Sequence, residues 1–171
     1  MFRGSLVALV TPMTESGEID HAAFGRLLDW HCRQGTDSIV VCGTTGESAT
    51  VGPAETAELL QIAVQRIGGR IPVIAGTGSN STAEAVDRTR AACELGVDGV
   101  LVVTPYYNRP PQEGLYRHFS LVADAASVPL ILYNVPSRTA CDLLPETVER
   151  LAAHPQIIGI KEATGDIGRG A

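Results

Sequence analysis

Short apolar runs rich in β-branched residues alternate with longer amphipathic stretches along the whole chain. The runs show little alternation of apolar and polar residues, which is typical of strands buried on both faces of a parallel sheet. We expect six strands, at Leu6–Val10, Ser38–Val41, Pro72–Ala75, Gly99–Val103, Leu130–Leu132 and Ile157–Ile160. We expect five helices between them, at His21–Gln34, Ala54–Ile67, Ala83–Leu95, Gly114–Ala126 and Glu146–Ala153. A strand and a helix recur about every 30 residues, which predicts an α/β fold.

Two α/β architectures fit this repeat. A (β/α)8 TIM barrel has eight such units in roughly 250 residues, and the 171 residues of this chain would hold its strands 1–6. A doubly wound open sheet is the alternative, because it needs no closure. Polar residues follow every predicted strand, and only a barrel gathers all of these strand ends at one rim. This favours an incomplete barrel, forming one domain over residues 1–171 that ends just after the sixth strand.

The edge of the sixth strand should carry unpaired backbone groups if nothing covers it. We therefore expect the isolated chain to be unstable or to aggregate unless another polypeptide completes the barrel.

Composition excludes several classes of protein. The net charge is −6 and no basic run occurs, which argues against a nucleic-acid partner. The longest apolar run near the start is too short for a membrane span. The four cysteines lie far apart without a CxxC pair, and the four histidines lack the spacing of metal ligands. We expect a cytoplasmic protein with free thiols and with no metal or cofactor.

Lys161 is the only lysine among 13 basic residues, and it follows the apolar run Ile157–Ile160. A lysine at the end of a buried strand loses hydration, which can lower its pKa from about 10.4 to roughly 7–8. The neutral amine can attack a ketone and form an imine, which serves as an electron sink for making or breaking a carbon–carbon bond. Arginine cannot do this because it stays protonated. The sequence therefore predicts a Schiff-base lysine.

Other strand ends could serve the same chemistry. Tyr133 ends the strand before Lys161, and its hydroxyl could carry protons, although a core tyrosine is the alternative. Arg138 could hold a substrate carboxylate or lie free on the surface. The small residues of Gly43–Glu47 could hold an anion with backbone N–H groups or form a plain turn. With Gly76–Asn80 they could also cradle phosphates in an open-sheet nucleotide-binding module, but the lysine and hydroxyl residue of a P-loop are absent.

Four strings, GTTGESAT, TPYYNRPPQEGLYRHF, YNVPSRT and IIGIKEATGD, together resemble the dihydrodipicolinate synthase family of pyruvate-dependent class I aldolase-like lyases. The resemblance runs from Gly4 to the end of the chain. It implies condensation of pyruvate with L-aspartate 4-semialdehyde to 4-hydroxy-tetrahydrodipicolinate, in lysine and diaminopimelate biosynthesis. It also implies a dimer of dimers, and members of nearly 300 residues.

The resemblance also assigns roles to individual residues. Lys161 would bind pyruvate, and Tyr133, Thr44 and Tyr107 would relay protons, with Tyr107 reaching into a neighbouring subunit. Thr45 would hold the pyruvate carboxylate and Arg138 the carboxylate of the aldehyde. The residues matching the lining of a lysine feedback site are Ala49, Gly78, Asn80, Glu84 and Tyr106.

Several functions stay open at this point. Pro53 and Thr56 stand where lysine-inhibited members often have histidines, which leaves lysine sensitivity undecided. Thr44-Thr45 and the string Ser137–Thr139 favour the synthase over an N-acetylneuraminate lyase, another pyruvate-dependent enzyme. A truncated and catalytically silent chain is the remaining alternative.

Overall fold

The computed structural model describes residues 2–170. They form two compact units. The first unit runs to Gly76 and includes Ala91–Gly99, and the second holds Thr77–Arg90 and the residues from Val100 onward. Helix α3 (Thr82–Glu94) contributes residues to both units.

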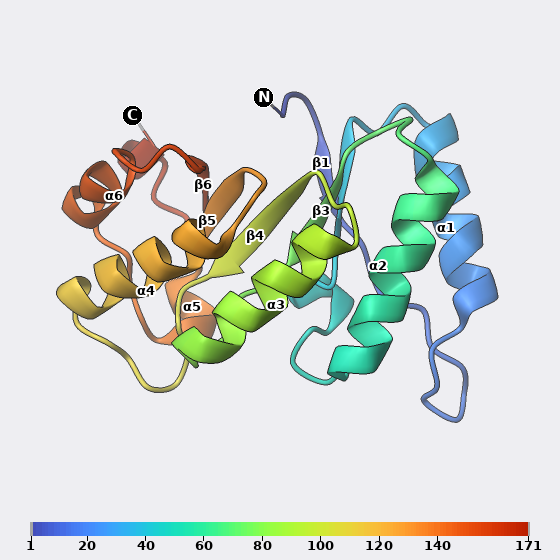
Figure 1. The fold of residues 1–171 in the computed structure, drawn as a ribbon, viewed down its shortest axis with the longest axis horizontal. Coiled ribbons are helices and arrows are strands. Elements are labelled where there is room, and N and C mark those ends of the chain that lie inside the picture. The colour runs from blue at the N-terminus through green and yellow to red at the C-terminus, as the bar shows by residue number, and fades with distance from the viewer. Residues whose placement is uncertain (1, 171) are drawn as a thin grey trace. The chain divides into compact units, whose positions relative to one another are not determined.

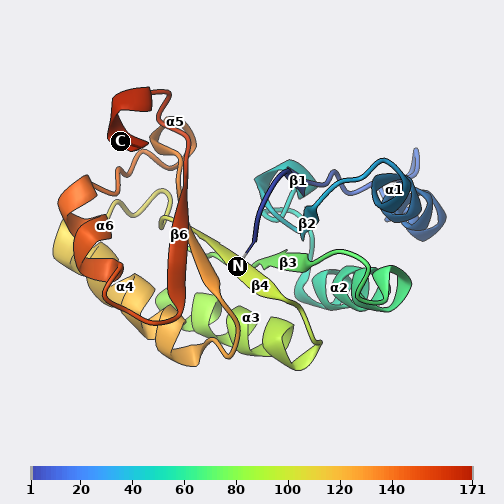
Figure 2. The ribbon, with the colours of Figure 1, turned by 90° about the horizontal axis from the view of Figure 1, so that it is seen from above.

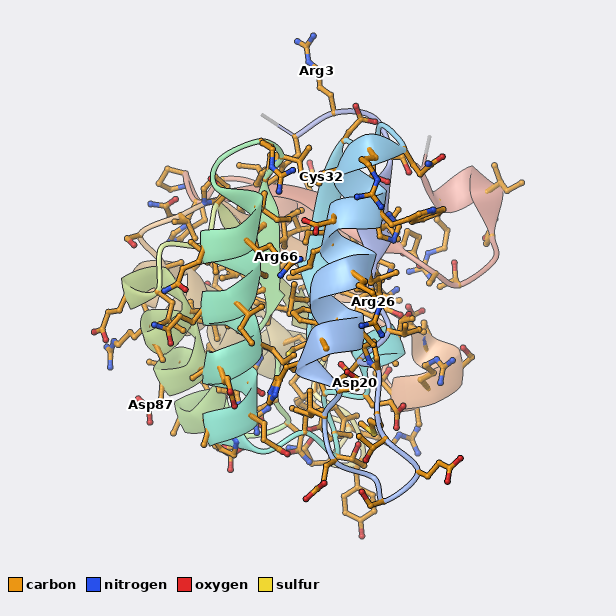
Figure 3. All side chains as sticks on the ribbon, turned by 90° about the vertical axis from the view of Figure 1, so that its right-hand side faces the viewer. Arg3, Asp20, Arg26, Cys32, Arg66 and Asp87 are labelled. Carbon is orange, nitrogen blue, oxygen red and sulfur yellow. The ribbon has the colours of Figure 1, made fainter. Side chains whose placement is uncertain are left out.

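The first unit contains a parallel sheet backed by two long helices. Its elements are β1 (Leu6–Ala8), α1 (His21–Arg33), β2 (Ser38–Val41), the 3₁₀ turn η1 (Thr44–Gly46), α2 (Pro53–Ile67) and β3 (Val73–Gly76). Strand β2 pairs in parallel with β1 and with β3. Helices α1 and α2 lie side by side (Figures 1 and 2). Arg66 of α2 donates a 2.7 Å hydrogen bond to Asp29 of α1, and Figure 3 shows this arginine between the two helices.

The second unit repeats the pattern. Its elements are β4 (Gly99–Val103), of which only Gly99 belongs to the first unit, α4 (Gln112–Ala125), β5 (Leu130–Asn134), the short α5 (Pro136–Thr139), α6 (Pro145–Leu151), β6 (Ile157–Glu162) and the 3₁₀ turn η2 (Ile167–Gly170). Strand β5 pairs in parallel with β4 and with β6. Helices α4 and α6 lie side by side (Figures 1 and 2), and the side chain of Arg150 in α6 bonds to Glu113 in α4 at 3.0 Å.

Apolar side chains from strands and helices fill each unit. The largest fully buried ones in the first unit are Phe24, Leu28, Ile39, Leu59, Ile67 and Ile74. Those in the second unit are Leu115, Phe119, Leu130, Leu132, Leu143 and Leu151. Burial of such side chains contributes most of the stability that fixes the strands, and the strands in turn position their carboxyl ends.

Local sequence signals set where the helices begin. Asp20 accepts a hydrogen bond from Ala23 N–H at 2.7 Å and so caps α1, whose start Figure 3 labels. At the start of α2, Pro53 is the first helical residue and the Glu55 carboxylate accepts from Gly52 N–H at 2.7 Å. Gly68 ends α2 in the left-handed conformation that glycine adopts without strain.

All six predicted strands and all five predicted helices are present, with bounds shifted by a few residues. The three short elements α5, η1 and η2 were not predicted. The expectation that every strand is buried on both faces is wrong for β1 and for β6, where Leu6, Ile158 and Lys161 are exposed. Within residues 2–170, β6 pairs with β5 alone, so the backbone groups of only one edge of this strand are paired in the sheet. No helix within these residues has the length and apolar character needed to span a membrane.

Candidate active site

Lys161 and Tyr133 form the centre of the candidate site in the second unit. They occupy paired positions in the β5–β6 ladder, so their side chains project from the same face of the sheet. The Nζ atom of Lys161 lies 4.3 Å from the centroid of the Tyr133 ring. Tyr133 itself is buried, with 6% of its surface exposed. The structure thus brings the predicted amine to the predicted phenol.

The environment of Lys161 differs from the one expected. We expected Lys161 at the end of a buried strand, but it is the fifth of six residues in β6, a strand with exposed residues, and much of its own surface is exposed. The amine end nevertheless rests over the ring of Tyr133, where it loses part of its hydration. This partial burial lowers the pKa of the Lys161 amine, which raises the fraction of neutral nucleophile at neutral pH.

A second group of side chains lies on the opposite face of β5 and β6, and sequence reasoning missed it. Asn134 Nδ2 donates to Asp142 Oδ1 at 2.9 Å and to Glu162 Oε2 at 3.1 Å. Arg169 donates to both oxygens of Asp142 at 3.0 Å. Burial favours the neutral acid at Asp142, but the bonds from Asn134 and Arg169 outweigh it and lower the pKa of the carboxyl. The sequence did contain one signal for this group, because a polar residue directly follows Tyr133 (Asn134) and Lys161 (Glu162).

Arg138 and Tyr107 lie on two segments of the second unit that are joined through Thr139. Arg138 is exposed on α5. The backbone N–H of Tyr107 donates to the carbonyl of Thr139 at 3.4 Å, and the buried Thr139 hydroxyl accepts from Thr104 at 3.4 Å. The Tyr107 side chain is 90% exposed on a backbone with φ of 73°, a conformation that costs energy for a residue other than glycine.

Thr44 and Thr45 belong to the first unit, where both are exposed in the turn η1 that follows β2. The buried Thr11 hydroxyl donates to the carbonyl of Gly46 at 2.7 Å and fixes this turn. A Cβ at Gly46 would lie 3.0 Å from the Leu9 carbonyl, so a larger residue fits poorly there. The glycine-rich string therefore forms a tight turn that presents two hydroxyl residues.

Four of the five residues matching the lysine feedback site lie in the second unit: Gly78, Asn80 and Glu84 around the start of α3, and Tyr106 after β4. Glu84 accepts from Ser79 Oγ at 2.9 Å and bonds to Arg88 at 3.3 Å. The backbone carbonyl of Asn80 accepts a hydrogen bond from Asn108 Nδ2 at 2.9 Å. Gly78 and Tyr106 are half-buried, and the fifth residue, Ala49, is exposed in the first unit.

Two buried groups, the Cys42 thiol and the His118 imidazole, are held in their neutral forms at neutral pH. All four cysteines are free, and burial raises the pKa of the Cys42 thiol to about 11, so it stays protonated. Burial lowers the pKa of His118 to about 4, which keeps that imidazole neutral. Within residues 2–170, no group of three or more His, Cys, Asp or Glu side chains is arranged to hold a metal ion.

Comparison with known proteins places this geometry in a family. The model of the dihydrodipicolinate synthetase family matches residues 1–170. The chain is 59% identical over 169 residues to 4-hydroxy-tetrahydrodipicolinate synthase of Ectopseudomonas mendocina, covering 99% of this chain and 58% of that protein. It is 58% identical over 170 residues to the synthase of Stutzerimonas stutzeri, again covering 58% of the relative.

Solved structures agree with these matches. The dihydrodipicolinate synthase of Acinetobacter baumannii complexed with pyruvate is 52% identical, with a TM-score of 0.98 over 99% of this chain and 58% of that one. The synthase of Methylacidiphilum fumariolicum gives 48% identity and a TM-score of 0.96. The predicted α/β class, an incomplete barrel containing strands 1–6, is confirmed, and the open-sheet alternative is wrong. The chain spans a little over half the length of these relatives, and it belongs to the dihydrodipicolinate synthetase family.

Proposed function

We propose that the chain provides the Schiff-base site of a 4-hydroxy-tetrahydrodipicolinate synthase, which condenses pyruvate with L-aspartate 4-semialdehyde. The observation that carries this proposal is the Lys161 amine held 4.3 Å from the centre of the Tyr133 ring. Pyruvate also fits the comparison, because the related enzyme of Acinetobacter baumannii was crystallised with it.

The reaction begins at the Lys161 nitrogen. Its lone pair attacks C2 of pyruvate and a nitrogen–carbon bond forms. The ketone oxygen takes up two protons, one lost by the amine nitrogen and one from an acid, and leaves as water. The resulting iminium acidifies the C3 protons, and loss of one of them gives an enamine. The enamine carbon attacks the aldehyde of the second substrate, whose oxygen is protonated. The amino group of that substrate then displaces Lys161 from C2 and closes the ring.

Tyr133 is the proposed proton carrier beside Lys161. Its ring is buried and paired in register with the lysine, so its position is set by the sheet rather than by a loop. Thr44 and Tyr107 complete the proposed relay. Thr45 is proposed to bind the pyruvate carboxylate through its backbone, and Arg138 to bind the carboxylate of the aldehyde with its guanidinium.

The exposed Tyr107 supports an oligomer. A tyrosine that is 90% exposed on a strained backbone gains stability when another surface covers it. We propose that it completes the site of a second subunit within a dimer of dimers. We also propose a cytoplasmic location, with which the free thiols agree.

The activity test measures formation of the cyclic product from pyruvate and L-aspartate 4-semialdehyde. Lys161→Arg should abolish it, because a guanidinium cannot form an imine. Tyr133→Phe keeps the ring under the lysine but removes the hydroxyl, and should lower the rate by about 100-fold. Cleavage of N-acetylneuraminate without synthase activity would favour the related lyase instead. Full activity in Lys161→Arg would contradict the proposal.

A feedback role for the second-unit residues is a separate proposal. Glu84 offers a carboxylate to an ammonium group, and Asn80 and Tyr106 offer an amide and a phenol. Added L-lysine should lower the initial rate if the site functions, and Glu84→Gln should weaken that inhibition. Equal inhibition of the variant and the wild type would contradict a role for Glu84.

A further inference from the structure

The pairing of β5 and β6 contains one irregularity that decides where Lys161 points. Leu130 pairs with Ile157, but the next residue of β5, Ile131, pairs with Gly159. Ile158 is therefore an extra residue in β6, a β-bulge. Beyond it the ladder continues regularly, with Tyr133 opposite Lys161 and Asn134 opposite Glu162.

The bulge is what places the amine beside the phenol. With no extra residue, Ile131 would pair with Ile158, and Lys161 would stand opposite Asn134. Neighbouring residues of a strand point to opposite faces of the sheet, so Lys161 would then project away from the face of Tyr133. Ile158 itself is 39% exposed, so core packing alone does not hold it in the bulged position.

The contacts that favour the bulged register lie on the other face, directly after the reactive pair. Asn134 is fully buried, and its Nδ2 donates to Glu162 Oε1 and Oε2 at 3.3 and 3.1 Å. The Glu162 carboxylate also accepts from Thr164 N–H at 2.9 Å. The backbone carbonyl of Asn134 accepts from Ala163 N–H at 2.9 Å, which continues the β5–β6 ladder past Lys161.

Asn134 is itself held in one orientation. Its Oδ1 accepts from Leu143 N–H at 3.0 Å, while Nδ2 faces the carboxylates of Asp142 and Glu162. Asp142 is in turn bound by Arg169 through both oxygens. The amide hydrogens of Asn134 thus bridge two carboxylates that would otherwise repel each other, and a slip of β6 by one residue would remove Glu162 from reach.

We propose that Asn134 and Glu162 form a register lock, two positioning residues that hold β6 in its bulged register and thereby keep the Lys161 amine on the ring of Tyr133. Neither residue touches the reacting atoms. The lock is a property of the fold, and its consequence for catalysis rests on the proposed function.

The sole lysine makes the lock directly measurable. Reductive methylation with ¹³C-formaldehyde labels one side-chain amine, that of Lys161, and the N-terminal amine gives a separate signal. Methyl groups above an aromatic ring experience a ring-current shift, so the wild-type Lys161 signal should be displaced from the position seen in the unfolded chain. Tyr133→Phe keeps the ring and should keep the displacement.

Two variants break the lock. Asn134→Asp replaces the bridging donor by a third carboxylate, and Glu162→Ala removes the acceptor at a half-buried position. Both should abolish the ring-current displacement. Glu162→Gln keeps an acceptor oxygen for Asn134 and should retain it. Thr89→Val removes a different buried hydrogen bond of the second unit, from Thr89 to Thr77 at 2.9 Å, and should also retain it.

Trapping of pyruvate with borohydride supplies the second readout. Displacement of a reacting group by about 1 Å can already cost on the order of 100-fold in rate. Loss of the register turns Lys161 to the other face of the sheet, so the two lock-breaking variants should trap pyruvate at least about 100-fold more slowly. If folded Glu162→Ala or folded Asn134→Asp keeps the wild-type ring-current displacement, the proposed register lock is wrong. A wild type that traps no pyruvate, with the ring-current results as expected, would overturn the proposed function and leave the lock supported.

Discussion

The buried His118 should make the stability of the chain depend on pH between about 4 and 6.5. The residue is 4% exposed and its Nδ1 lies 2.9 Å from Thr82 Oγ1, while its buried Nε2 has no hydrogen-bond partner among residues 2–170. Burial disfavours the charged imidazolium and lowers the pKa from 6.5 to about 4 in the folded chain. The folded state therefore takes up its proton at lower pH than the unfolded state.

The sign and size follow from proton linkage. Above pH 6.5 the imidazole is neutral in both states, so it contributes no pH dependence. Between pH 6.5 and about 4 the unfolded chain binds a proton that the folded chain does not, so the free energy of unfolding falls as the pH falls. A difference of about 2.5 units in pKa corresponds to about 3 kcal/mol over this interval.

Urea unfolding of the wild type and of His118→Gln at several pH values measures this difference. Glutamine can keep a hydrogen bond to Thr82 but does not titrate, so the variant should lose about 3 kcal/mol less than the wild type between pH 7 and pH 4. His21→Gln is the matched control, because the His21 side chain is 44% exposed and paired with Glu58 only at the surface. Parallel pH curves for His118→Gln and the wild type would refute the reasoning.

Two further substitutions test contacts that fix the units. Arg169→Ala removes the two hydrogen bonds to Asp142 at 3.0 Å. Because the Asp142 side chain is 38% exposed, the free energy of unfolding should fall by only about 1 kcal/mol. An unchanged urea midpoint would contradict this expectation. Asp20→Ala removes the cap of α1 and should lower the free energy of unfolding by about 1 kcal/mol, whereas Asp20→Asn should lower it less. Equal urea midpoints for Asp20→Ala and the wild type would show that the 2.7 Å bond to Ala23 does not stabilise the helix.

The regular part of the fold was predictable because burial and capping act locally. The strand Ser38–Val41 has three β-branched apolar residues after Ser38, and all four of its residues are buried. Asp20 and Pro53 mark helix starts by chemistry that operates within one turn of the helix. The strand-end pattern singled out Lys161 and Tyr133, and the family motifs then added Thr44 and Tyr107 as further candidates.

The exposure of Lys161 and the register lock could not be predicted in the same way. The string Ile157–Ile160 is as apolar as a buried strand, yet Ile158 and Gly159 are exposed. A bulge at Ile158 has no local signature, because its register depends on Asn134, which lies 28 residues from its partner Glu162. The pairing of Asn134 with Glu162 becomes visible only once the two strands are aligned.

The most direct test of the central claim is the identity of the residue that reacts with pyruvate. The chain is incubated with pyruvate, reduced with borohydride, and mapped by mass spectrometry after proteolysis. We predict one reduced pyruvate adduct, on the peptide that contains Lys161, and no adduct in Lys161→Arg. A folded sample that carries no adduct at Lys161, or carries it only on the N-terminal amine, would contradict the account.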